Sequence, residues 1–270
     1  MSTILRTILV GTCDPRSPLR HLRTQPIILR LVWKLLQDLW QSHIYKQDAW
    51  GYPPFWVLES PAVFPRPRDL YANMMPFVLG DKHSLPKKFR GYWKLIKYCA
   101  DVAETKSTAV CYLTVHESRV DNDEPQRRGG LHTESPGVLG SGTIVSWGGL
   151  LTTGGIFIAS SVANSTQVWP VAIRDLPGVV GDHGDLEHIR PVLGPGQRLD
   201  ANKLVWMSDT TPHESLPLAP GTYRQFFRLV MDDVSVWYQD HSTPNPLGTV
   251  PGPQTIIMVG DKFKGTAVPK

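Results

Sequence analysis

A histidine and a glutamate stand two positions apart in the stretch Arg127-Arg-Gly-Gly-Leu-His-Thr-Glu-Ser-Pro-Gly137. On an extended segment, side chains at positions i and i+2 point to one side, so His132 and Glu134 would present an imidazole and a carboxylate together. His213, from a distant part of the chain, offers a third ligand. Two imidazoles and one carboxylate that leave the other coordination positions open suit non-haem Fe(II). His132, Glu134 and His213 are therefore candidate metal ligands; the alternative for the pair is a loop histidine beside a solvated or helix-capping glutamate.

Two arginines follow His213 in a strand-like segment. Ten residues separate His213 from Arg224, and Arg228 stands four positions further on. On a strand, Arg224, Phe226 and Arg228 share one face. Two cations within an otherwise apolar strand are costly unless anions meet them. From this spacing alone, the two arginines either face anionic groups or are solvated on a surface strand.

The whole set resembles that of the Fe(II)/2-oxoglutarate-dependent oxygenase superfamily, whose double-stranded β-helix carries the pattern H-x-D/E…H…R. The spacing of Arg224 and Arg228 is similar to that of the taurine/clavaminate-type branch. Gly154-Gly155 and the strand-like run after them resemble a turn of the same branch. Glu134 stands where Asp is commoner, so the chain would be an H-x-E variant. The resemblance covers residues 108–232.

The resemblance implies a function. His132, Glu134 and His213 would bind Fe(II), Arg224 would hold the distal carboxylate of the cosubstrate 2-oxoglutarate, and Arg228 would bind a small anionic substrate. With dioxygen, such an enzyme couples 2-oxoglutarate decarboxylation to C–H oxidation, in this case of a specialised metabolite or an amino acid. The outcome, whether hydroxylation, desaturation or cyclisation, stays open, although Glu134 argues against halogenation.

One departure from the branch keeps an alternative open. Phe157 occupies the position after Gly-Gly where a hydroxyl residue usually contacts the cosubstrate, although Ser160, Ser161 or Asn164 could replace it. An iron-dependent, 2-oxoglutarate-independent oxidase or cyclase, in which the substrate carboxylate pairs with Arg224, is therefore a second hypothesis. A non-catalytic jelly-roll binding module is a third, from another class of protein.

Other histidines compete for these roles. His183 and Asp185 form an H-x-D pattern, but they stand in a Gly- and Asp-rich segment that we interpret as a loop. His116 and Glu117 are adjacent and would face opposite sides of a strand, with His116 toward the interior of the barrel. His241 lies in a turn region rich in proline and polar residues.

The first part of the chain is expected to be helical and irregular. Residues 1–24 are interpreted as an arm or strand followed by a loop. Apolar residues at three- and four-residue steps predict an amphipathic helix over 27–45, with Pro26 in its first turn. Five prolines make 50–68 an ordered loop, and a second helix is expected over 89–102.

From Thr108 onward the chain consists of short β-rich runs separated by turn residues. The predicted strands are 109–116, 142–146, 155–159, 167–173, 203–207, 224–231 and 235–238. Such a succession is typical of an antiparallel barrel or jelly roll. The expected fold is mainly β, a double-stranded β-helix (jelly-roll) barrel with an N-terminal helical layer. We predict a single domain, 1–270, with a helical part at 1–106, a barrel core at 107–240 and a C-terminal tail at 241–270.

Composition limits the location and partners of the protein. The formal net charge is +4, and basic residues do not alternate with aromatic ones, so no nucleic-acid partner is expected. Charged residues interrupt the longest apolar run, which argues against a membrane span. Three cysteines at scattered spacing fit a reducing compartment. We expect a cytoplasmic protein of open oligomeric state; a transit peptide is the alternative, because the first thirteen residues lack acids.

Overall fold

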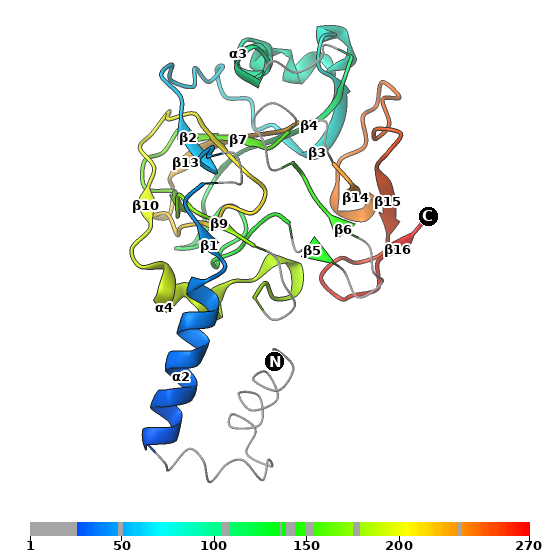
Figure 1. The fold of residues 1–270 in the computed structure, drawn as a ribbon. Helices are drawn as coiled ribbons and strands as arrows, with labels where there is room; N and C mark the ends of the chain where they lie inside the picture. The colour runs from blue at the N-terminus through cyan, green and yellow to red at the C-terminus, as the bar shows by residue number, and fades with distance from the viewer. Residues whose placement is uncertain are drawn as a thin grey trace.

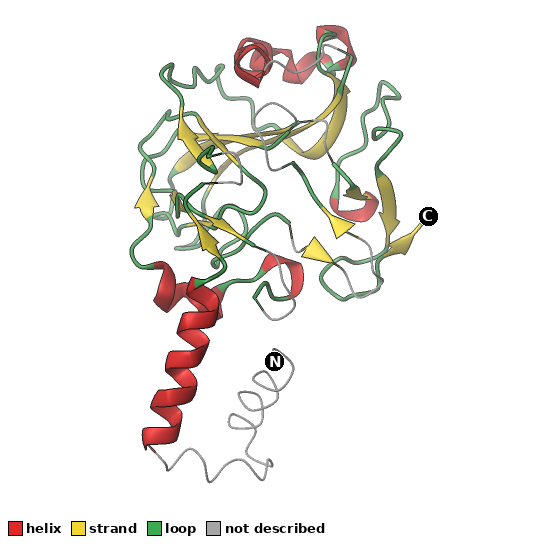
Figure 2. Cartoon of the chain, in the orientation of Figure 1, coloured by secondary structure: helices red, strands yellow, loops and turns green. Residues whose placement is uncertain are grey.

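The computed structural model describes residues 26–47, 51–103, 108–135, 137–138, 144–148, 154–174, 179–231 and 234–270. The arm or strand expected over residues 1–24 lies outside these ranges, as do the first residues of the strand expected at 142–146. Within them the protein is mainly β, with short strands joined by long loops and few helices (Figure 2). No described helix has both the length and the apolar character needed to cross a bilayer.

Both expected helices are present, with shifted ends. The described helices are α2 (Pro26–Gln41), α3 (Trp93–Ala103) and α4 (Arg190–Leu193). The first helix ends four residues earlier than expected because the two-residue strand β1 (Ile44–Tyr45) pairs with β9 (Ala172–Ile173). The second begins as a 3₁₀ turn over Lys87–Tyr92 before it becomes α3. Figure 1 shows α2 extending away from the β-rich body and α3 lying across the opposite end.

The largest sheet has six strands, in the order β2-β11-β7-β13-β4-β3. Its strands are β2 (Phe55–Val57), β3 (Tyr71–Val78), β4 (Val110–Arg119), β7 (Ile156–Ser160), β11 (Val205–Met207) and β13 (Tyr223–Val230). Every neighbouring pair is antiparallel. The strands expected at 109–116, 155–159, 203–207 and 224–231 are therefore confirmed, whereas β2 and β3 were not expected.

The smaller sheets complete the β structure. One has the order β10-β8-β12, formed by β8 (Thr166–Val168), β10 (Gln197–Arg198) and β12 (His213–Ser215). A second joins β14 (Val236–Tyr238), β15 (Ile256–Val259) and β16 (Val268–Pro269), and a third joins β5 (Gly137–Val138) to β6 (Ile144–Val145). The run expected at 167–173 is divided between β8 and β9. Residues 241–270 are more than a tail, because β15 pairs with β14.

The six-stranded sheet has two different faces. Along β13, Phe227 and Leu229 point into the apolar core that α3 covers, together with Leu113 of β4. The alternate side chains point to the opposite face, where Arg224 and Arg228 line a cavity. Side chains alternate along a strand, so one strand can pack a core on one face and form a polar site on the other. The predicted common face of the two arginines is confirmed.

Candidate metal centre

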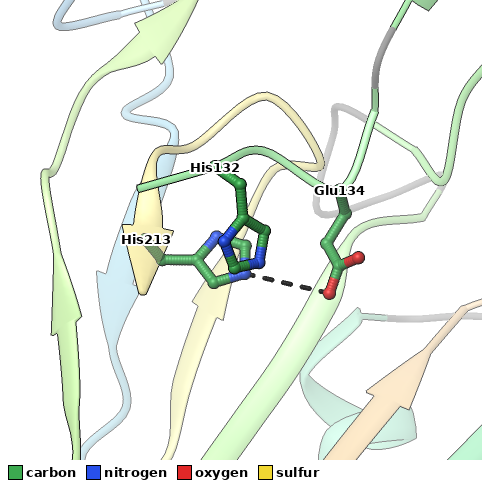
Figure 3. A group of neighbouring side chains, drawn as sticks. All are labelled: His132, Glu134 and His213. Atoms are coloured by element: carbon green, nitrogen blue, oxygen red, sulfur yellow. Dashed lines mark ion pairs between the residues drawn. The ribbon is translucent and has the colours of Figure 1, made fainter. Parts of the chain in front are cut away.

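Two short segments bring the predicted ligands together. His132 and His213 form an isolated antiparallel bridge, in which His132 N donates to His213 O at 3.0 Å and His213 N to His132 O at 2.9 Å. Glu134 follows two positions later, and its backbone N–H donates to Asp209 O at 3.1 Å. The candidate ligand atoms of His132, Glu134 and His213 all lie within 4.8 Å of one another (Figure 3). This group could hold a metal ion.

Each imidazole is held by a hydrogen bond at its Nδ1. His132 Nδ1 lies 2.7 Å from Gly130 O, and His213 Nδ1 lies 2.9 Å from Thr211 O. A carbonyl oxygen only accepts hydrogen bonds, so each Nδ1 carries a hydrogen and Nε2 is the ring nitrogen left to coordinate a metal. A backbone carbonyl on the second ring nitrogen is the usual outer partner of a metal-bound histidine.

The protonation states also suit a metal. Burial raises the pKa of Glu134, but the neighbouring Arg228 guanidinium and the two histidines outweigh it and hold this pKa well below its usual range. Burial, with His213 and the Arg128 guanidinium nearby, keeps the pKa of His132 well below its usual value. The site therefore presents an ionised carboxylate and a neutral imidazole, the forms that coordinate metals.

The segment Asp182–Ile189 holds the backbone next to His132 and Glu134 through two hydrogen bonds. Thr133 N donates to Gly184 O at 2.9 Å, and Leu131 N donates to Glu187 Oε1 at 2.7 Å. Gly184 has a φ of +83°, and a Cβ there would lie 2.2 Å from Thr133 O, so only glycine fits. His183 and Asp185 are not part of the candidate metal group. Instead of the loop interpreted from the sequence, His183 lies in a 3₁₀ helix, Asp182–Gly184, and Asp185 forms an isolated bridge with His132.

A cavity of about 470 Å³ opens beside the three ligands. Arg224, Arg228 and His116 also line it. Burial, with Arg127 and Arg224 nearby, lowers the pKa of His116 to about 4, so this imidazole is neutral. As expected, His116 and Glu117 face opposite sides of β4: His116 lines the cavity, and Glu117 accepts a hydrogen bond from the Tyr92 hydroxyl.

Arg224 is fully buried and contacts only neutral side chains. Its Nε, Nη1 and Nη2 donate to the hydroxyls of Ser160, Ser215 and Thr166 at 2.9, 3.0 and 3.1 Å. No carboxylate of the described residues lies within ion-pair distance of it. Burial and the charge of Arg127 lower the pKa of Arg224 to about 9. An anion entering the cavity would relieve this cost.

Arg228 has a different environment from the one expected. Its Nη1 donates to Glu134 Oε1, and its Nη2 donates to Thr114 Oγ1 at 3.3 Å. The guanidinium also lies 5.3 Å from the centre of the Trp147 ring. The anion that Arg228 faces in the structure is thus a metal-ligand candidate of the protein itself. The role predicted for it, binding of a substrate anion, stays a prediction.

Phe157, which stands where a hydroxyl residue was expected, lies on the core face of the six-stranded sheet. Phe157 packs in the core beneath α3, on the face away from the cavity, so it does not replace a cavity hydroxyl. Ser160, one of the proposed substitutes, does reach Arg224. Gly155 has a φ of +88°, and a Cβ there would lie 2.3 Å from Nε1 of Trp206, so the turn requires glycine.

Several cavity residues were given no role from the sequence, among them Ser215 and Thr166, which hold Arg224, and the cations Arg127 and Lys262. Arg127 stands in the same motif as His132, which was the available signal. Lys262 lies in the segment expected to be a tail, and its neighbouring sequence carries no comparable signal.

No protein-family model and no curated protein sequence matches the chain. Among solved structures, it is similar to EvdO2 from Micromonospora carbonacea var. aurantiaca, with a TM-score of 0.36 and 10% identity over 67% of this chain and 71% of that one. It is also similar to AviO1 from Streptomyces viridochromogenes Tue57, with a TM-score of 0.32 and 14% identity over 72% of this chain and 76% of that one. These values are too low to assign a function.

Proposed function

We propose that the chain is a mononuclear non-haem Fe(II) oxygenase that uses 2-oxoglutarate and dioxygen to oxidise a C–H bond of a small anionic substrate. The observation that carries the proposal is the convergence of His132, Glu134 and His213 in one cavity with the unpaired Arg224. In this proposal the six-stranded sheet and the β10-β8-β12 sheet are the two sheets of a double-stranded β-helix.

Each part of the cavity has a role in this chemistry. The two imidazoles and the carboxylate are a ligand set that leaves positions open for a cosubstrate and dioxygen, as Fe(II) oxygenases require. Fe(II), when bound, supplies the activation of dioxygen. Arg224 fits the distal carboxylate of 2-oxoglutarate, because a guanidinium binds a carboxylate through charge-assisted hydrogen bonds. The hydroxyls of Ser215 and Thr166 hold Arg224 in position to do so.

The experiment is an anaerobic titration of the protein with Fe(II) followed by 2-oxoglutarate. A visible charge-transfer band is expected when the cosubstrate chelates the metal, and Arg224→Met should weaken cosubstrate binding without weakening metal binding. The expected loss is about 2–3 kcal/mol, the value of hydrogen bonds to charged groups. The absence of the band would rule out the cosubstrate.

The other two hypotheses predict different results. The 2-oxoglutarate-independent oxidase rested on Phe157, which faces the core instead of the cavity, so its main support is removed. Oxygen consumption without succinate formation would nevertheless favour it. A protein that binds no exchangeable Fe(II) would be the non-catalytic binding module.

A further inference from the structure

The cavity contains more positive charge than its own carboxylates neutralise. Its wall carries the cations Arg127, Arg128, Arg224, Arg228 and Lys262. The carboxylates in the same wall are Glu134 and Glu214. Glu134 pairs with Arg228, and Glu214 pairs at 2.8 Å with Arg190, a residue outside the wall. The cavity therefore has cations left over after its carboxylates are paired.

Arg127 is one of these unneutralised cations. Its Nη2 donates to the amide oxygen of Asn73 at 2.9 Å, and its guanidinium lies 5.5 Å from the centre of the Phe226 ring. Both partners are neutral. Burial and the charge of Arg228 lower the pKa of Arg127 to about 10, which shows that this environment disfavours its charge.

Lys262 is another of the cations that the carboxylates of the cavity leave unneutralised. Its Nζ lies 5.0 Å from the centre of the Tyr238 ring and 5.6 Å from that of Phe263. Aromatic faces hold an ammonium in place but do not neutralise it. Among the described residues, neither Lys262 nor Arg127 forms an ion pair with a carboxylate. Burial and the charges of Arg128 and Arg228 lower the pKa of Lys262 to about 8.

Hydrogen bonds fix the backbone around Lys262. Lys262 N donates to His241 Nε2 at 2.9 Å. Asp261 Oδ1 accepts from the backbone N–H groups of Phe263 and Lys264 at 2.9 and 3.2 Å. Asn73, which accepts from Arg127, donates through its Nδ2 to His241 O at 2.6 Å, so Arg127 and Lys262 are both linked to His241 in the wall of the same cavity.

We propose that Arg127 and Lys262 form a second anion-binding subsite, separate from Arg224, that holds an oxyanion group of the ligand that enters the cavity. A carboxylate or a phosphate supplies the oxygens that both side chains bind. If the proposed function is correct, that ligand is the substrate: 2-oxoglutarate pairs with Arg224, and the substrate carries its own negative charge toward Arg127 and Lys262. This role was expected of Arg228, which instead contacts Glu134.

The subsite can be tested without knowledge of the substrate. Thermal unfolding of the apoprotein in EDTA is followed with increasing inorganic phosphate, at an ionic strength held constant with sodium chloride. A ligand that binds the folded state raises the Tm, by roughly a few degrees at concentrations well above its Kd. We expect this rise in the wild-type protein and in Arg224→Met, and its loss in the Arg127→Met/Lys262→Met double variant.

The control variant is Lys264→Met, which removes a cation from the same segment but from an exposed position outside the cavity wall. It should keep the full rise in Tm. A rise that survives in the double variant, or no rise in the wild-type protein, would overturn the subsite. A rise lost only in Arg224→Met would place the anion at Arg224, overturning the subsite and leaving the proposed function intact.

A second measurement covers the case in which the double variant does not fold. Wild-type protein is treated with acetic anhydride at pH 8, and acetylation of each lysine is followed by mass spectrometry. Lys262 should react severalfold more slowly in phosphate than in chloride, whereas the rate at Lys264 should not change. Equal rates at Lys262 in the two salts would contradict the proposal.

Discussion

Arg228 Nη1 donates a hydrogen bond to Glu134 Oε1, the same oxygen that lies 3.8 Å from Nε2 of His213. One guanidinium thus neutralises the carboxylate and holds it toward the imidazoles before any metal binds. A metal ion would provide a second positive partner for the same group. Arg228 is therefore both a stabilising partner of the metal-free protein and an outer partner of the metal site.

This pairing predicts a stability loss that depends on metal. Arg228→Met leaves Glu134 buried and unpaired, which typically costs about 3–5 kcal/mol. Bound metal would replace the missing charge, so urea unfolding should show a large loss in EDTA and a smaller one in excess Zn²⁺. Arg119→Met, an exposed arginine on β4, is the control and should change neither value much. Equal losses in the two conditions would contradict this role of Arg228.

The metal group predicts a selective loss of affinity. Glu134→Gln keeps the shape of the side chain but removes its charge, so binding of Co²⁺, measured by calorimetry, should weaken by more than the roughly 10–100-fold typical of outer partners. The matched control is Glu214→Gln, because Glu214 also lines the cavity but pairs with Arg190. Similar affinities for the two variants would exclude Glu134 as a ligand.

His116 predicts a pH dependence of stability. The folded protein lowers the pKa of His116 from 6.5 to about 4, mainly by burial. Between these pH values the unfolded chain binds more protons than the folded one, so the free energy of unfolding falls as the pH is lowered through this range. His116→Gln cannot titrate and should lose less stability between pH 7 and pH 5 in urea unfolding. Parallel pH profiles would show that His116 does not contribute.

Gly155, in the turn before β7, has no room for a Cβ, and Gly51 serves as a control because it has a similar φ but open surroundings. Gly155 and Gly51 have nearly the same φ, +88° and +87°, but a Cβ on Gly51 would meet nothing within 4 Å. Gly51→Ala should cost only the backbone term of about 1–2 kcal/mol. Gly155→Ala adds a clash with Trp206 and should cost about 1–3 kcal/mol more, as overpacked cores do. Equal losses of unfolding free energy would argue against the clash.

The pairing of His132 with Glu134 could be predicted because its signal is local, whereas His213 comes from a distant part of the chain. The period of an extended chain places His132 and Glu134 on one side, and the residue types limit the chemistry. The partner of Arg228 could not be predicted in the same way, because strand alternation fixes the face of a side chain but not what meets it across a cavity. Lys262 reaches the cavity through a segment held by the pairing of β14 with β15, which local sequence does not encode.

The fold was predictable to a similar extent. The long strands β4 and β13 are rich in β-branched and aromatic residues and were expected within a few residues. The strand β3 was missed because Asn73 and Pro76 disfavour strands. The structure places β3 at the edge of its sheet, the position where proline is tolerated. The strand β12 is only three residues long, too short for any periodicity to show.

The bridge between His132 and His213 has a consequence for how the protein is made. The two candidate ligands come from distant parts of the chain, and two backbone hydrogen bonds join them directly. Contacts of high sequence separation must close large loops and tend to form slowly. A chain still being synthesised cannot capture the metal through the full group until residue 213 has emerged and β12 has paired with β8. Binding of a metal by all three side chains would then show that this bridge has formed.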